Sequence, residues 1–214
     1  MFKINKDVKT KPEVKEKIVF SDEDIIKMFD NLSSKNDNLK MLVYLLFYTG
    51  LRSSDILTIK AEKVNLELQE LCYYSPKRKK YRDIAFHSDL IPILEQIISN
   101  EKLMEKTEGR LLNFNNVEHL NRALTRYFSD LEIRSKGYTA RTFRKTFITL
   151  ARSRYNMDAT IVKELVDHEL TNTTDRYYNS VTMDAMRSEL AKFKRPINQS
   201  NKQAHLKLLK YKLK

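Results

Sequence analysis

Two tyrosines and a histidine near the C-terminal end of the chain are the residues best suited to covalent chemistry. His168 opens the stretch HELTNTTDRYYN, and Tyr177 follows it nine residues later, directly before Tyr178. A free phenol titrates near pH ~10, so it becomes a nucleophile only beside cations and a proton acceptor. A helix turns about 100° per residue, so both rings cannot point into one site. One tyrosine is a candidate nucleophile, and ordinary packing is the alternative for both.

Cations that could surround such a tyrosine occur in three separate places. The first is Arg52, which follows an apolar segment ending at Gly50; its simplest interpretation is an ion pair with Asp55, three residues on. The second is the run KRKKYR, which either contacts phosphates or forms a solvated turn between two strands. Its basic residues are Lys77, Arg78, Lys79, Lys80 and Arg82.

The third place is the segment TARTFRKTF. On a helix, Phe143, Phe147 and Leu150 share one face, which we expect to be buried. Arg141 and Arg144 lie three residues apart on another face, and Arg144 borders the apolar side. A guanidinium at the edge of a core is costly unless it holds an anion, and its planar fork matches the paired oxygens of a phosphate. This segment therefore predicts an anion-binding arginine.

The composition favours a packed domain with an anionic partner. The chain has 214 residues, of which 41% are hydrophobic and 10% aromatic, enough for one sizeable core. Lys and Arg total 40 against 28 acidic residues, and the net charge of +12 favours nucleic acid over simple solubility. The single cysteine, Cys72, excludes an internal disulfide and suits a reducing compartment. Scattered histidines predict no metal site, and the absence of long apolar runs predicts no signal peptide and no membrane span.

The elements that must position these residues are mostly helical. Ser21 is a candidate N-cap, and NLKMLVYLLFYTG predicts a nearly all-apolar, central helix that ends at Gly50. LQELCYYS and RDIAFH, around the charged turn, predict a hairpin or a three-stranded sheet. Helical patterns follow in DLIPILEQIISNEKLMEK, VEHLNRALTRYFSDL, RTFRKTFITLARSRY, DATIVKELVDH and NTTDRYYN. The predicted fold class is mainly α with a small antiparallel β-sheet (α+β).

In this order, the segments resemble the catalytic domain of tyrosine recombinases, the phage integrase family. TGLRSSDIL resembles the box that carries the family's first arginine, and SPKRKKYRDIAF resembles the strand pair that carries its lysine. TARTFRKTFITL is similar to the family's His-x-x-Arg box. LVDHELTNTTDRYY is similar to the box in which a histidine precedes the nucleophile by nine residues. The resemblance spans residues 49–178 and depends on the order and spacing of all four boxes.

The resemblance implies cleavage and rejoining of DNA through a 3′-phosphotyrosine intermediate, with no metal or other cofactor. Tyr177 is then the nucleophile and Lys77 the acid that protonates the leaving 5′ oxygen. Arg52 and Arg144 neutralise the non-bridging oxygens, and His168 donates a hydrogen bond to the phosphate. The basic hairpin residues are expected to contact the DNA backbone: Arg78, Lys79, Lys80 and Arg82.

One position departs from the family pattern. Where the family has a histidine, this chain has Arg141, which cannot accept a proton but can bind phosphate. Two other classes of protein therefore stay open. One is a catalytically impaired DNA-binding relative, and the other is a telomere resolvase or type IB topoisomerase that shares the chemistry but not its outcome.

The expected domain organisation is a basic arm or linker over residues 1–20, a catalytic domain over 21–195 and a basic tail over 196–214. The tail contains a leucine stripe that needs a surface to cover it (Leu206, Leu209 and Leu213). The resemblance implies exchange of this tail between protomers; docking on its own domain and lying on DNA stay open. It also implies double-stranded DNA as partner, a homo-oligomer on DNA (a tetrameric synapse), and a cytoplasmic, nucleoid-associated location in a prokaryotic or virus-infected cell.

Overall fold

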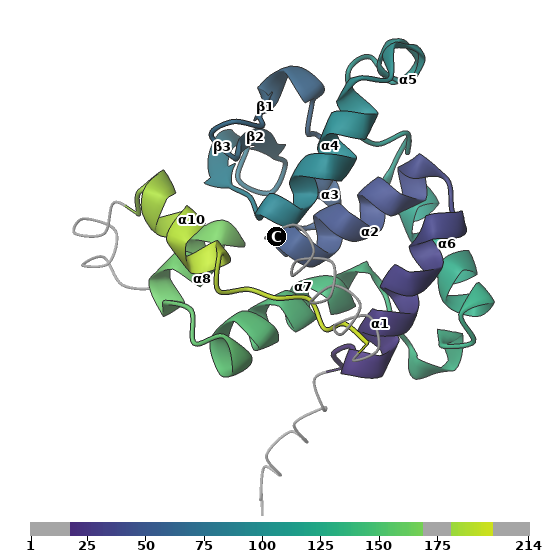
Figure 1. Cartoon of the computed structure of the whole chain (residues 1–214). Coiled ribbons are helices and arrows are strands. Elements are labelled where there is room, and N and C mark those ends of the chain that lie inside the picture. The colour runs from purple at the N-terminus through teal and green to yellow at the C-terminus, as the bar shows by residue number, and fades with distance from the viewer. Residues whose placement is uncertain (1–17, 169–180, 199–214) are drawn as a thin grey trace, which may run out of the picture.

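The computed structural model describes residues 18–168 and 181–198, and helices dominate these ranges beside an antiparallel sheet of three strands (Figure 1). The strands are β1 (Val64–Asn65), β2 (Glu70–Ser75) and β3 (Lys80–Ala85). The helices are α1 (Asp22–Asn31), α2 (Asp37–Thr49), α3 (Ser53–Ile56), α4 (Ile91–Ile98), α5 (Glu101–Lys106), α6 (Val117–Asp130), α7 (Ala140–Thr149), α8 (Ala159–Leu165) and α10 (Met183–Leu190). The predicted fold class, mainly α with a small antiparallel sheet, is confirmed.

Helix α2 forms the centre of the core, as its nearly all-apolar sequence predicts. Asn36 caps its start by accepting from the Leu39 amide, and Gly50 ends it in the left-handed conformation at φ +60°. A Cβ atom added to Gly50 would lie 2.5 Å from Cδ1 of Phe147, so α7 packs on the end of α2 with no room for a side chain there. Phe143 and Phe147 of α7 are fully buried, which confirms the apolar face expected for that helix.

The sheet presents its basic turn at one end. Strands β2 and β3 pair antiparallel with Tyr73 opposite Arg82 and Ser75 opposite Lys80, and the four-residue turn 76–79 connects them. Because paired residues lie on the same face of a sheet, Arg82 shares a face with the buried Tyr73. The predicted hairpin is therefore present, with β1 added on the outer side of β2.

Two stretches differ from the patterns read in the sequence. The segment 89–106 forms two helices rather than one, because Asn100 caps a new start by accepting from the Leu103 amide. The structure also contains α10, which was not among the expected helices. Thr182 caps α10 by accepting from the Ala185 amide, and its inner face is buried through Met186 and Leu190.

The segment after α10 is held against the core. Figure 1 shows it running from α10 past α7 to α1. The Phe193 ring is fully buried and lies 4.9 Å from that of Phe147, and the Phe193 carbonyl contacts His87 Nε2 at 2.9 Å. The Arg195 guanidinium lies 4.5 Å above the Phe29 ring. Most of the expected arm of residues 1–20 and most of the expected tail of residues 196–214 lie outside the described residues, which begin at residue 18 and end at residue 198.

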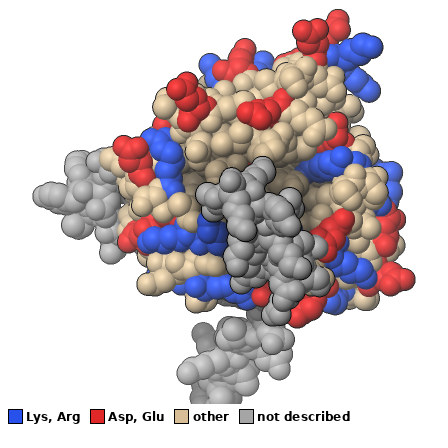
Figure 2. All heavy atoms as spheres, in the orientation of Figure 1, with Lys and Arg blue, Asp and Glu red and all other residues tan. Residues whose placement is uncertain are grey.

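Charged side chains are mixed on the face shown in Figure 2. Among the described residues visible in this view, Lys and Arg are interspersed with Asp and Glu. Within the described ranges, no helix combines the length and the apolar character that a membrane crossing requires.

Candidate active site

A cavity of about 560 Å³ brings together four of the six predicted catalytic residues. Arg52 enters it from the start of α3, Lys77 from the β2–β3 turn, Arg144 from α7 and His168 from the turn after α8. Two of the predicted DNA-binding residues, Arg78 and Lys80, also line it. Segments up to 116 residues apart in the sequence therefore converge on one strongly basic cavity.

Arg52 is fixed by two carboxylates. Its Nη1 donates to Asp55 Oδ2 at 3.3 Å, which confirms the ion pair expected from their spacing, and to Asp167 Oδ2 at 2.6 Å. Its Nη2 donates to the Asp167 carbonyl at 2.8 Å. Burial raises the pKa of Asp55, and the charge of Arg52 opposes this shift. The ionised form of Asp55 is therefore stabilised by its arginine partner. The guanidinium is thus held by hydrogen bonds on two sides.

Arg144 sits at the edge of the core, as its helical position predicts. Its Nη1 donates to the carbonyl of Gly50 at 3.0 Å, while its Nη2 is buried without a hydrogen-bond partner among the described residues. Burial, and then the charge of Arg52, lower the pKa of Arg144 to about 10, so the group is still a cation at pH 7. A buried cationic donor with an unmade hydrogen bond is destabilising unless an anion completes it.

His168 is the one residue lining this cavity, within the described ranges, whose charge can change near neutral pH. Partial desolvation lowers its pKa, and the charges of Arg144, Arg52 and Lys77 lower it further. The imidazole is therefore neutral at pH 7. In that state one ring nitrogen donates a hydrogen bond and the other accepts one.

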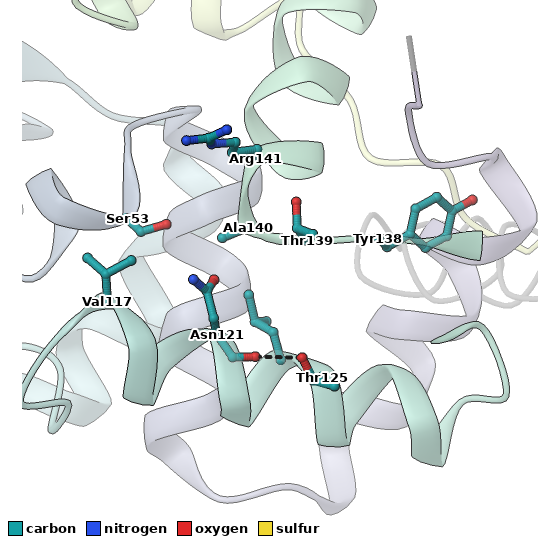
Figure 3. Close-up of a pocket in the computed structure, with 9 residues that line it drawn as sticks. Ser53, Val117, Asn121, Thr125, Tyr138, Thr139, Ala140 and Arg141 are labelled. Carbon is teal, nitrogen blue, oxygen red and sulfur yellow. Dashed lines mark hydrogen bonds between the residues drawn. The ribbon is translucent and has the colours of Figure 1, made fainter. Parts of the chain in front are cut away.

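Arg141 lies outside this cavity. It is exposed on the first turn of α7 and lines a neighbouring hollow of about 420 Å³ together with Ser53 of α3 and Asn121 of α6 (Figure 3). A smaller hollow of about 220 Å³ is lined by both Arg141 and Arg144 and adjoins the two sites. The residue in the family's histidine position is thus one helical turn away from the basic cavity, facing α3 and α6.

The predicted DNA-binding residues of the hairpin divide into two groups. Lys79 and Lys80 are exposed, as is Lys77. By contrast, Arg78 Nε forms an ion pair with Asp167 Oδ1 at 2.6 Å, and Arg82 is largely buried in an ion pair with Glu164. The lysines are available to an external anion, whereas the arginines already have internal carboxylates.

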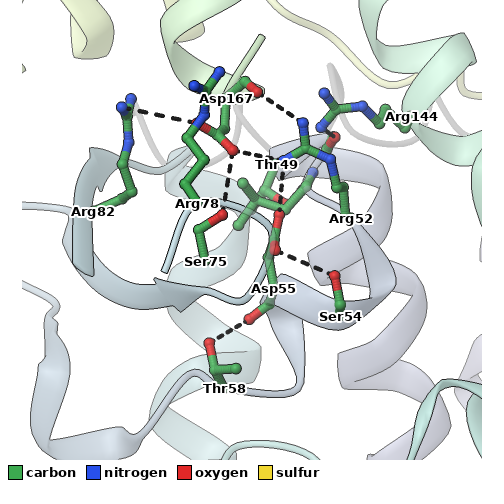
Figure 4. A network of polar contacts seen from close by, with 12 residues as sticks. Thr49, Arg52, Ser54, Asp55, Thr58, Ser75, Arg78, Arg82, Arg144 and Asp167 are labelled. Atoms are coloured by element: carbon green, nitrogen blue, oxygen red, sulfur yellow. Dashed lines mark hydrogen bonds and ion pairs between the residues drawn. The ribbon is translucent and has the colours of Figure 1, made fainter. Parts of the chain in front are cut away.

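The principal polar residue that the sequence patterns did not single out is Asp167. Its side chain is only 1% exposed, and Figure 4 shows it at the centre of the network, with Arg52, Arg78 and Arg82 directed toward it. Ser75 Oγ also donates to its Oδ2 at 3.3 Å. The available signal was an acidic residue directly before the candidate His168. Only the folded chain shows that its partners lie 85 to 115 residues earlier.

Tyr177, the predicted nucleophile, and its neighbour Tyr178 lie outside the described residues. The segment that contains them joins His168, which lines the cavity, to α10. Within the described ranges, no group of three or more His, Cys, Asp or Glu side chains is arranged to hold a metal ion.

The element order and the small sheet give the chain the fold of tyrosine recombinase catalytic domains. The chain belongs to the phage integrase family, whose sequence profile matches residues 19–184. No curated protein matches the chain at a significant level.

Solved structures share this fold at low sequence identity. The integrase from mycobacterium phage Brujita is 17% identical, with a TM-score of 0.66, and the match covers 83% of this chain and 58% of that one. XerA recombinase is 20% identical with a TM-score of 0.63, covering 82% and 64% of the two chains. XerH recombinase, solved bound to its difH substrate, is 19% identical with a TM-score of 0.59, covering 75% and 50%. The chain thus covers less than two thirds of the length of these structures.

Proposed function

We propose that this domain cleaves and rejoins double-stranded DNA at a specific site through a covalent phosphotyrosine intermediate. The observation that carries the proposal is the convergence of Arg52, Lys77, Arg144 and His168 on one cavity. Four groups able to donate hydrogen bonds to oxygen, three of them cations at pH 7, match a phosphodiester whose charge increases in the transition state. Double-stranded DNA is supported as the partner by the family and by the net charge of +12.

In the proposed reaction, the Tyr177 oxygen attacks the scissile phosphorus and displaces the 5′ oxygen. This step leaves a 3′-phosphotyrosine bond and a free 5′-hydroxyl. Lys77 protonates the leaving oxygen, while Arg52 and the unsatisfied Nη2 of Arg144 bind the non-bridging oxygens. Because the phosphotyrosine bond conserves the energy of the phosphodiester, rejoining requires no nucleotide cofactor.

The proton of Tyr177 needs an acceptor, and Arg141 cannot serve. His168 is neutral at pH 7 because its pKa is lowered, so it has a lone pair for this proton and an N–H for a phosphate oxygen. Arg141, exposed beside the cavity, is assigned to a neighbouring backbone phosphate. Oligomeric assembly on DNA is supported by a neighbour of the same fold, the lambda integrase dimer bound to a core site.

Covalent trapping tests the proposal. Randomised duplexes with a nick near the cleavage position release a short strand after cleavage, so the adduct cannot religate and survives in SDS. The wild-type chain should select a sequence and form the adduct, Tyr177→Phe should form none with its DNA affinity nearly intact, and Tyr178→Phe should form it normally.

A second candidate, a DNA-binding relative without catalysis, is favoured by the position of Arg141 outside the cavity. It predicts sequence-specific binding with no adduct from the wild-type chain. Relaxation of supercoiled plasmid without a selected sequence would instead indicate a topoisomerase.

A further inference from the structure

Asp167 occupies a backbone position that local rules reserve for other residues. Helix α8 ends in a Schellman motif, in which the His168 amide donates to the Lys163 carbonyl at 2.9 Å and the Asp167 amide to the Glu164 carbonyl at 3.1 Å. Asp167 therefore stands at the left-handed position of the motif, with φ +50°. Glycine is the usual residue there, and a left-handed conformation costs about 1–2 kcal/mol in most others.

The charge of Asp167 is also unfavourable for this position. The C-terminal end of a helix carries partial negative charge, which repels a carboxylate. The side chain is moreover only 1% exposed, and a buried carboxylate is destabilising unless it is paired. The helix dipole and burial thus both disfavour aspartate at a position where glycine is usual, and residues that break several local rules at once are concentrated at functional sites.

Three arginines and a serine offset these penalties. Asp167 Oδ2 accepts from Arg52 and Ser75, and Oδ1 lies 2.6 Å from Arg78 Nε and 3.8 Å from Arg82 Nη1. Burial alone would raise the pKa of Asp167, but the hydrogen bond from Arg52 and the charges of the arginines hold it below its usual value. The carboxylate is therefore ionised at neutral pH.

The contacts determine which edge of Arg52 remains available. A guanidinium has five N–H donors, and described residues accept from three of them, two on Nη1 and one on Nη2. The donors that remain are those of Nε and the second hydrogen of Nη2, which lie along one edge of the fork. That edge fits two oxygens of a phosphate in a bidentate arrangement.

We propose that Asp167 is a positioning residue for the strand-transfer reaction. Its carboxylate and carbonyl hold Arg52 with the Nε–Nη2 edge directed at the scissile phosphate. Through Ser75 and Arg78 the same carboxylate fixes the base of the turn that carries Lys77. This inference rests on the proposed function. It assigns a role to a residue whose side chain is only 1% exposed and therefore acts through its neighbours.

A positioning role separates DNA binding from cleavage. Removing the carboxylate takes one negative charge from the network beside the cavity and makes its net charge more positive by one. DNA affinity should therefore stay equal or increase. Cleavage should slow, because Arg52 is no longer held in one orientation and displacement by about 1 Å can lower a rate on the order of 100-fold. Loss of a residue needed only for folding would lower DNA affinity and cleavage together.

The test uses Asp167→Gly, which suits φ +50°, and Asp167→Asn, which keeps the shape. A matched control is Glu132→Gly, because Glu132 is also acidic and has a left-handed backbone (φ +57°). Its side chain is 89% exposed and forms an ion pair with Lys27 at 3.9 Å. Adduct formation on the selected nicked duplex, measured in a single turnover, should fall by up to about 100-fold in both Asp167 variants. Glu132→Gly should cleave at the wild-type rate, and thermal melts should show all variants folded.

A double variant tests whether Asp167 acts through Arg52. In an Arg52→Ala background, Asp167→Gly should cause little further loss, because the group that it positions is absent. Two results would overturn this inference but not the proposed function. One is a loss of activity in the double variant equal to the product of the two single losses. The other is wild-type activity in both Asp167→Asn and Asp167→Gly. Absence of adduct from the wild-type chain would overturn the proposed function and this inference with it.

Discussion

Replacing Gly50 by alanine should destabilise the domain at the point where the core meets the candidate active site. Gly50 has φ +60°, where an alanine is strained by about 1–2 kcal/mol. The new Cβ would also lie 2.5 Å from Cδ1 and 2.8 Å from Cγ of Phe147, a fully buried ring. Overpacking of this kind costs about 1–3 kcal/mol. Gly50→Ala should therefore lower the free energy of unfolding by about 2–5 kcal/mol.

Gly137→Ala is the matched control for this substitution. Gly137 also has a left-handed backbone, with φ +69°, but nothing lies within 4 Å of its added Cβ. Its loss should be the backbone part alone, about 1–2 kcal/mol. The difference between the two variants measures the contact between α2 and α7, free of the conformational penalty that they share.

Urea unfolding followed by far-UV circular dichroism measures both losses. In thermal melts, a domain of this size loses about 2–4 °C per kcal/mol, so Gly50→Ala should melt about 4–20 °C lower and Gly137→Ala about 2–8 °C lower. Equal shifts would refute the reasoning, because they would show that Phe147 moves aside freely. A larger loss in Gly137→Ala would also refute it.

The remaining predictions concern charge. Replacing either exposed hairpin lysine should reduce the salt dependence of DNA binding by about 0.9 in log–log slope. The variants are Lys80→Ala and Lys79→Asn, and asparagine is chosen because Lys79 has φ +53°. Arg82→Ala should leave the slope unchanged, because Glu164 already pairs with that arginine. An unchanged slope in the lysine variants would mean that the hairpin points away from DNA. The His168 imidazole, followed by NMR, should titrate below its usual pKa of 6.5, so it loses its proton at a lower pH than a free imidazole. Arg144→Ala should move that midpoint upward, since the charge of Arg144 contributes to the lowering, and a midpoint that does not move would contradict this electrostatic account.

Local sequence spacing was sufficient to predict several features of the site. The Arg52–Asp55 ion pair follows from a separation of three residues, and the buried face of α7 follows from helical periodicity at Phe143 and Phe147. Gly50 as the end of α2 follows from the rarity of other residues in a left-handed cap. Each of these depends on neighbours within a turn of the chain, which is the range in which sequence patterns are informative.

Features set by the fold were beyond such patterns. Arg82 belongs to a continuous basic run, but the register with Tyr73 places it on the inner face of the hairpin, where it meets Glu164. Asp167 is adjacent to His168 in the sequence, yet its partners come from β2, β3, the turn between them and the start of α3. Charge composition indicates how many cations a segment has, but the direction of each side chain depends on strand pairing and helix packing.

The network around Asp167 also has a consequence for synthesis of the chain. Arg52 precedes Asp167 by 115 residues, so at about 5–20 residues per second the ribosome adds the carboxylate about 6–23 s after the arginine. During that interval Arg78 and Arg82 also lack Asp167, with which they form ion pairs in the folded domain. A nascent or truncated product that stops between residues 145 and 166 has the site's arginines and the hairpin lysines without this counter-charge. Such a product is expected to adhere to polyanions such as RNA while lacking an ordered site, and only the last third of the sequence converts the basic cluster into a shaped cavity.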